Sequence, residues 1–291
     1  FMANLKEIRT RITSVESTMQ ITSAMKMVSA AKLKRAQDAI VQMRPFAKKF
    51  NDILVNVSST LDNSDHPMIK SNKGNKILLI ALSSNRGLCG GFNNNIVKEI
   101  KKTISSNPEN NYSILTVGKK VFDAFKKTDL INNSDHLPKD VQSIWDSLNY
   151  ENSIEITNKL ISAFKNNQFD KAFIIYNSFK NAAIQSTQNE PFLPVSPPHI
   201  ESSTNTDYIY EPDKEEILND LIPQSLKIQL YKALLDSFAS EHGARMTAMH
   251  KATDNANEMK NDLKLFYNKA RQAAITNEIL EIVAGAEALG G

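Results

Sequence analysis

Apolar and small side chains recur at alternating steps of three and four residues over positions 224–284. This spacing is typical of the contact seam of a coiled coil. The stretch contains no proline and a single glycine, so it predicts an unbroken helix. A helix of about 60 residues extends roughly 90 Å, longer than a small domain, so we expect it to pack along another helix. The seam positions are Ile228, Tyr231, Leu235, Phe238, Met249, Ala252, Ala256, Met259, Leu263, Phe266, Ala270, Ala273, Leu280 and Ala284.

A second helix with the same spacing opens the chain. Its seam consists of Leu5, Ile8, Ile12, Val15, Met19 and Thr22. The repeat is interrupted at 25–28 and returns from Leu33 to Met43, after which Pro45 should kink or end the helix. Because the two seams lie at opposite ends of the chain with room for a domain between them, we expect an antiparallel pair within one chain. A parallel pair formed by two copies is the alternative.

Between the terminal helices, short apolar runs alternate with amphipathic stretches. The runs at 76–82, 113–117 and 172–176 predict buried strands, and the stretches 94–104, 119–126 and 153–164 predict helices. A plausible extra edge strand passes through 183–187. Positions 190–206 are rich in proline, serine and threonine, and we expect them to be irregular because Pro191 and the later prolines cannot donate to a sheet.

The predicted fold class is therefore α/β. A long antiparallel coiled coil of the N- and C-terminal helices accompanies a central Rossmann-like domain, whose alternating strands and helices favour a mainly parallel sheet. The expected limits are 2–60 for the N-terminal helix, 74–195 for the central domain and 210–288 for the C-terminal helix.

Composition narrows the classes of partner. The net charge of +3 is too small to indicate nucleic acid, although Lys26, Lys32, Lys34 and Arg35 make the first helix locally basic. The longest apolar run, 77–82, is far shorter than the roughly 20 residues that cross a bilayer, and no apolar signal region opens the chain. The single cysteine excludes an internal disulfide framework and fits a reducing compartment.

A glycine-rich stretch at 83–92 follows the first strand and precedes a helix, which is where doubly wound folds bind phosphates. The spacing does not match the dinucleotide-binding pattern, and Gly118 with Lys119 lacks the first glycine of a P-loop. We therefore expect Gly87, Gly90 and Gly91 to serve a tight turn and a close backbone approach.

The sequence offers no convincing catalytic group. Cys89 has no histidine or acid nearby in the sequence, and the five histidines show no metal-binding spacing. We expect no catalytic residue, no metal and no cofactor, so the chain is not predicted to be an enzyme. Polar side chains do occupy three seam positions: His242, Arg245 and Asn277. They either fix the register of the coil or mark a helix that is surrounded by protein.

Three stretches together resemble the gamma subunit of F-type ATP synthases, and the similarity covers essentially the whole chain. The first comprises 8–12 and 21–32, the second is 85–93, and the third is 267–279. Each is fairly specific, and they occur in the family's order.

The resemblance implies a central rotor shaft that couples proton-driven rotation of a c-ring to ATP synthesis or hydrolysis in an alpha/beta hexamer. It implies one copy per complex, contacts with the epsilon subunit, and a peripheral position on the cytoplasmic face of a bacterial inner membrane. It also implies contacts with the hexamer at seven positions. These are Met25, Lys26, Arg245, Arg271, Gln272, Thr276 and Glu278.

Two other functions compete with this one. A nucleotide-dependent enzyme built on the central domain would bind phosphate at 86–91. A self-associating coiled-coil scaffold would form an elongated parallel dimer.

Overall fold

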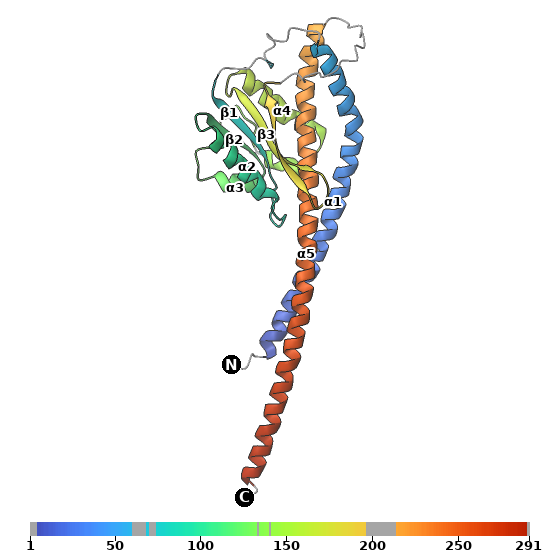
Figure 1. The fold of residues 1–291 in the computed structure, drawn as a ribbon, viewed down its shortest axis with the longest axis vertical. Coiled ribbons are helices and arrows are strands. Elements are labelled where there is room, and N and C mark those ends of the chain that lie inside the picture. The colour runs from blue at the N-terminus through green and yellow to red at the C-terminus, as the bar shows by residue number, and fades with distance from the viewer. Residues whose placement is uncertain are drawn as a thin grey trace. The chain divides into compact units, whose positions relative to one another are not determined.

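The computed structural model describes residues 5–59, 68–69, 74–132, 134–139, 141–195 and 214–289. Two long helices, α1 (Leu5–Ser59) and α5 (Lys214–Leu289), begin and end the described chain (Figure 1). The chain divides into two compact units. We call Phe1–Ser29 with Met246–Gly291 the terminal unit, and Ala30–Arg245 the central unit.

The central unit is built on a four-stranded sheet in the order β2-β1-β3-β4. The strands are β1 (Lys76–Leu82), β2 (Asn111–Val117), β3 (Lys171–Phe179) and β4 (Gln185–Leu193). β1 pairs in parallel with both β2 and β3, and β4 pairs antiparallel with β3 at the edge. The expected α/β class with a mainly parallel sheet is confirmed.

Helices cover both faces of this sheet, and the alternation of side chains along β1 explains why. Leu78, Ile80 and Leu82 point to one face, where they pack with α4 (Tyr150–Lys165), the 3₁₀ helix η2 (Val141–Trp145) and the early part of α5. Ile77, Leu79 and Ala81 point to the other face, against α2 (Phe92–Ser106) and α3 (Lys119–Phe125). Burial on both faces is what the continuous apolar run predicted.

One expectation about prolines is wrong, and another is restricted. Pro45 lies inside α1 and does not end it, so of its two expected effects only the kink stays a prediction. Pro191 lies within β4, opposite Phe173, although the sequence from 190 onward was expected to be irregular. β4 is an edge strand, so one side of its backbone has no neighbouring strand and the missing N–H of proline is tolerated there. Positions 196–206 lie outside the described residues.

In the terminal unit the two helices run antiparallel, and four polar contacts fix their register. Arg9 donates to the Tyr267 hydroxyl over 3.3 Å, Lys260 lies 4.0 Å from Glu16, the Thr22 and Thr253 hydroxyls lie 2.8 Å apart, and Lys26 Nζ lies 3.3 Å from His250 Nδ1. The residue numbers of each pair add to 275 or 276. Contacts at a constant sum are the property of an antiparallel pair, so this expectation is confirmed.

The seam of α1 is more regular than the sequence indicated. Buried and half-buried positions continue at steps of three and four from Leu5 through Thr22, Lys26 and Ser29 to Leu33. The expected interruption at 25–28 is wrong, because Lys26 and Ser29 occupy seam positions with polar side chains.

On α5 the expected seam is displaced at every second position. The inward-facing residues beyond Met249 are Thr253, Ala256, Lys260, Leu263, Tyr267, Ala270 and Ala274. Met259 and Phe266, which the spacing assigned to the seam, are 54% and 51% exposed. The neighbouring Lys260 and Tyr267 side chains take their places, whereas Ala252 is half-buried together with Thr253.

Candidate functional site

Four of the predicted partner-contact residues lie in the last part of α5. By the constant register, Leu5 lies opposite Arg271, so Gln272, Thr276 and Glu278 lie beyond the first described residue of α1. All four side chains are exposed. The Thr276 hydroxyl donates to the backbone carbonyl of Gln272 over 3.0 Å, within α5 itself. The structure thus presents these groups to solvent, and their contacts with other subunits stay a prediction.

This stretch of α5 also carries large apolar side chains that the chain itself does not cover. Exposed fractions between 49% and 66% are found for Ile275, Ile279, Leu280, Ile282 and Val283. Farther from the end, Leu265 and Phe266 are exposed as well. Apolar side chains gathered on one exposed element indicate a surface that binds another protein.

Met25 and Lys26 lie in the paired part of α1 and are both half-buried. The Met25 carbonyl accepts from the Ser29 hydroxyl at 2.7 Å, and Lys26 approaches His250, which in turn lies 3.5 Å from Asp254. Met25 therefore contributes to the coil and keeps part of its side chain accessible. Its predicted contact with a partner is untested.

Arg245 has a different environment from the other predicted contact residues. Its side chain belongs to the central unit and is 8% exposed, and its guanidinium donates to Glu241 Oε1 at 2.6 Å. The same guanidinium donates to the backbone carbonyls of Arg86 and Gly87 at 3.2 and 3.3 Å. Of the two readings of the polar seam residues, the structure supports the one in which the helix is surrounded by protein at this point.

His242 lies one turn from Arg245 and is also buried. Burial, followed by the charges of Arg245 and Lys32, lowers the pKa of His242 to about 3. Its ring packs edge-on against Phe238, with centroids 4.4 Å apart, and its Nδ1 has no hydrogen-bond partner within the described residues. Asn277, the third polar seam residue, is exposed.

The glycine-rich loop between β1 and α2 satisfies its own polar groups. The Ser84 hydroxyl donates to the Arg86 carbonyl at 2.6 Å, and the Asn93 amide donates to Ser84 Oγ at 2.8 Å. Cys89 is 1% exposed, and burial raises the pKa of its thiol. A thiol with a raised pKa is a poor nucleophile at neutral pH, so the structure gives no support to catalysis by Cys89.

Gly90 serves the expected turn, but the close backbone approach expected in this stretch lies elsewhere. Gly90 has a positive φ of 58° and makes the turn, whereas Gly87 and Gly91 have only ordinary contacts around them. The close backbone approach occurs at Gly118, where an added Cβ would lie 2.0 Å from the Ser83 carbonyl oxygen. Leu88 has a φ of 64° and a side chain that is 64% exposed.

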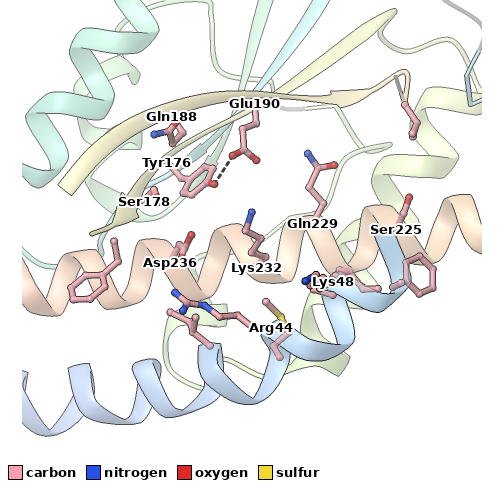
Figure 2. A pocket seen from close by; sticks show the side chains of 17 residues that line it. Arg44, Lys48, Tyr176, Ser178, Gln188, Glu190, Ser225, Gln229, Lys232 and Asp236 are labelled. Carbon is pink, nitrogen blue, oxygen red and sulfur yellow. Dashed lines mark hydrogen bonds between the residues drawn. The ribbon is translucent and has the colours of Figure 1, made fainter. Parts of the chain in front are cut away.

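A cavity of about 770 Å³ lies between α1, α5 and the strands β3 and β4 of the central unit (Figure 2). Tyr176 donates to Glu190 at 2.8 Å, and burial together with Glu190 raises its pKa well above the ordinary value. Burial also raises the pKa of Asp236, against the opposing charges of Lys232 and Arg44. Both shifts favour the neutral forms of these side chains.

Two further properties of the described residues concern metal sites and membrane-spanning helices. The described part of the chain holds no group of three or more histidine, cysteine or carboxylate side chains placed to share a metal ion. Among the helices that the structure covers, none combines the length and the apolar character that a membrane-spanning segment needs.

Comparison with known proteins gives the family. A sequence profile described as ATP synthase matches residues 4–289. The ATP synthase gamma chain of Flavobacterium johnsoniae is 56% identical over 292 residues and that of Christiangramia forsetii is 54% identical, and each alignment covers the whole of both chains. The chain belongs to the ATP synthase gamma chain family.

Chains of solved ATP synthase structures have a similar fold. The central stalk and c-ring structure of the Tetrahymena thermophila mitochondrial ATP synthase contains a chain that matches 80% of ours and 99% of its own length, with 25% identity and a TM-score of 0.57. A chain of the Euglena gracilis mitochondrial ATP synthase matches 98% of ours and 94% of its own length, with 20% identity and a TM-score of 0.64.

Membership of the gamma chain family confirms the resemblance drawn from the three stretches and the assignment to the central stalk of the enzyme. Family membership does not identify which residues of the chain contact the other subunits, so those contacts stay predictions. Sequence reasoning missed the contact between Arg245 and the glycine-rich loop, because nothing in the spacing of residues 86 and 245 reveals that they meet.

Proposed function

We propose that this chain is the rotating shaft of an F-type ATP synthase, and that it couples proton-driven rotation of a c-ring to conformational change in an alpha/beta hexamer. In this function the chain binds no nucleotide and carries no catalytic residue. It acts by changing which side it presents to each catalytic subunit.

The observation that supports this proposal best is the outward-facing apolar surface of the terminal unit. Ile21, Met27 and Val28 on α1 are exposed by 58% or more, and Met259, Phe266 and the apolar residues from 275 to 283 are exposed on α5. Within the paired part, the seam of the coil is already filled by its own two helices, and residues 275–283 lie beyond the described start of α1. Both sets of apolar residues are therefore left for another protein. A sleeve of subunits around the coil would cover them on all sides.

The same seam argues against a self-associating scaffold. Four polar contacts hold α1 and α5 of one chain in register, from Arg9 with Tyr267 to Lys26 with His250. A parallel dimer would have to break them, because its helices would pair equal residue numbers.

The coupling follows from symmetry. A pair of two unlike helices has no threefold axis, so it contacts three chemically equal catalytic subunits differently and makes their nucleotide affinities unequal. Rotation exchanges these states among the subunits. Because coupling between binding equilibria is reciprocal, nucleotide binding and release turn the shaft, and a driven shaft changes the affinities and releases ATP.

The partners proposed in detail are the alpha and beta subunits around the coil. The residues proposed to contact them are Met25, Lys26, Arg245, Arg271, Gln272, Thr276 and Glu278. The epsilon subunit and the c-ring contact other parts of the chain. One copy is present per complex, held at the cytoplasmic face of a bacterial inner membrane through the complex alone. Nucleic acid is not a partner.

Affinity purification from native membranes tests the proposal. A tagged chain should co-purify with three copies each of two catalytic-type subunits for every copy of itself, together with a membrane-embedded ring. Recovery as a dimer without these subunits would favour the scaffold. Micromolar binding of ATP by the isolated chain would favour the nucleotide-dependent enzyme.

A further inference from the structure

The segment 240–245 of α5 contacts two loops of the central unit within little more than one helical turn. Ser240 donates its hydroxyl proton to the Asn177 carbonyl at the end of β3, over 2.8 Å, and both residues are buried. Arg245 donates to the carbonyls of Arg86 and Gly87 in the loop after β1. The helix is therefore bound to the carboxyl ends of two neighbouring parallel strands.

Gly243 lets the helix approach the sheet closely between these two contacts. A Cβ added at this position would lie 3.1 Å from the ring of Phe179 and 3.3 Å from the Cα of Ala182. Both distances are shorter than ordinary contacts between carbon atoms. The only glycine in the predicted seam of α5 thus lies where the helix meets the turn that joins β3 to β4.

Arg245 makes the charged contacts of the set. The Arg245 and Glu241 side chains are 8% and 10% exposed, and a charge-assisted hydrogen bond of 2.6 Å joins them. Glu241 fixes one arm of the guanidinium, and the other arm reaches the two loop carbonyls. A planar guanidinium can make these contacts together, whereas a lysine ammonium lacks the fork.

We propose that Arg245 is a positioning residue: with Glu241 it fixes the Arg86–Gly91 loop to α5, so that the loop and the helix move as one body. On this basis Arg245 acts on the position of the loop, whichever other protein the helix meets. The loop that it holds has Arg86 and Leu88 exposed on its outer side and Cys89 buried beneath them. The consequence for coupling rests on the proposed function, but the contact itself does not.

Cys89 is a built-in reporter of this contact, because it is the only cysteine of the chain. Its thiol is 1% exposed and lies 3.1 Å from the Asn93 amide, so a thiol reagent reaches it only when the loop opens. The rate of thiol modification in the isolated full-length chain therefore measures how often the loop leaves the helix.

The test compares Arg245→Met and Arg245→Lys with the unchanged chain. We expect modification of Cys89 to become about tenfold faster or more in both variants, because each loses hydrogen bonds to the loop carbonyls. Arg35→Met is the matched control, since Arg35 is exposed on α1 in the same unit, and its rate should not change. Should Arg245→Met fail to fold because Glu241 is left unpaired, the double variant Glu241→Gln with Arg245→Met is measured in its place.

A second control separates a local effect from general destabilisation. Leu160→Ala opens a hole in the core on the sheet face opposite Cys89 and leaves the loop contacts intact. The proposal requires faster modification in the Arg245 variants than in Leu160→Ala at equal loss of stability. Equal rates, or an unchanged rate in a folded Arg245 variant, would overturn it. Neither result would affect the proposed rotor, which is tested by subunit stoichiometry.

Discussion

The hydroxyl oxygens of Thr22 and Thr253 lie 2.8 Å apart, although 231 positions separate the two residues in the chain. Each hydroxyl also lies within hydrogen-bonding distance of a carbonyl in its own helix, Thr22 of Met19 at 3.0 Å and Thr253 of Met249 at 2.8 Å. Since a hydroxyl has one proton, one threonine donates to its carbonyl and accepts from the other threonine. A polar pair inside a seam fixes register, because sliding either helix leaves its hydroxyl groups without partners. Beside the partly apolar contacts of the coil, this pair sets which residues of α1 and α5 face each other.

A disulfide across this pair tests the register. In a Cys89→Ser background, Thr22→Cys with Thr253→Cys should form an intramolecular disulfide on mild oxidation, visible as a mobility shift on a non-reducing gel. Hydroxyls this close place their Cβ atoms within reach of a disulfide. The control, Thr22→Cys with Lys264→Cys, lies three turns away and should not close. A disulfide-linked dimer as the main product of the first variant would contradict the intramolecular pairing.

The buried strands could be predicted from the sequence, but the exact seam of the coil could not. Continuous apolar runs such as 76–82 occur in strands that are buried on both faces, and the structure buries this run. In the coil, Met259 and Phe266 follow the seam spacing yet face outward, because the neighbouring Lys260 and Tyr267 side chains lie in the seam instead. The spacing of apolar residues alone does not distinguish an exposed apolar residue from one in the seam. Conversely, Thr253 and Lys260 lie in the seam although their residue types are typical of a surface.

The candidate site was predictable only in part. Gln272 and Thr276 are exposed, which agrees with the predicted contact with another subunit. That prediction came from the resemblance to the family, because residue spacing alone does not indicate it. The burial of Arg245 against the loop depends on the meeting of residues 159 positions apart, which no local pattern encodes. In the same way, the close backbone approach was expected in the glycine-rich stretch 83–92 but occurs at Gly118. The sequence around Gly118 does not indicate that it meets the Ser83 carbonyl.

Gly118→Ala should be strongly destabilising. The residue has a φ of 129°, and an added Cβ would lie 2.0 Å from the Ser83 carbonyl oxygen. Strain and the displaced backbone should cost more than about 2 kcal/mol of unfolding free energy. Fluorescence of Trp145, the only tryptophan and a hydrogen-bond donor to the Val117 carbonyl, reports urea unfolding of this region. Gly87→Ala is the control and should change the free energy by about 0.5 kcal/mol or less.

The central unit should become less stable as the pH is lowered, because of His242. Its pKa is about 3 in the folded chain against 6.5 ordinarily, so between these values the unfolded chain binds a proton that the folded chain does not. The free energy of unfolding therefore decreases as pH falls below 6.5, by up to about 1.4 kcal/mol per pH unit. His242→Leu should remove this loss. Trp145 fluorescence in urea at pH 7 and pH 5 compares the two chains, and equal pH dependence in both would contradict the assignment.

Gln272→Leu with Thr276→Val should weaken coupling in a reconstituted complex. The double variant removes hydrogen-bonding groups that the structure leaves exposed on α5, and each lost contact to a partner should cost about 1 kcal/mol. ATP hydrolysis and ATP-driven proton pumping are measured together, so that assembly and coupling can be told apart. Asn255→Leu, on the exposed side of the paired part of α5, is the control. Hydrolysis and pumping that both match the unchanged complex would remove these residues from the contact.

The rotation of the chain inside the complex can be observed directly. The alpha/beta hexamer is fixed to a surface, and a bead is attached to a cysteine introduced at Lys101, an exposed position on α2, in the Cys89→Ser background. Addition of ATP should turn the bead continuously in one direction, because each hydrolysis event changes which catalytic subunit prefers which side of the shaft. A bead that stays fixed while the assembled complex hydrolyses ATP at its full rate would contradict the proposed function.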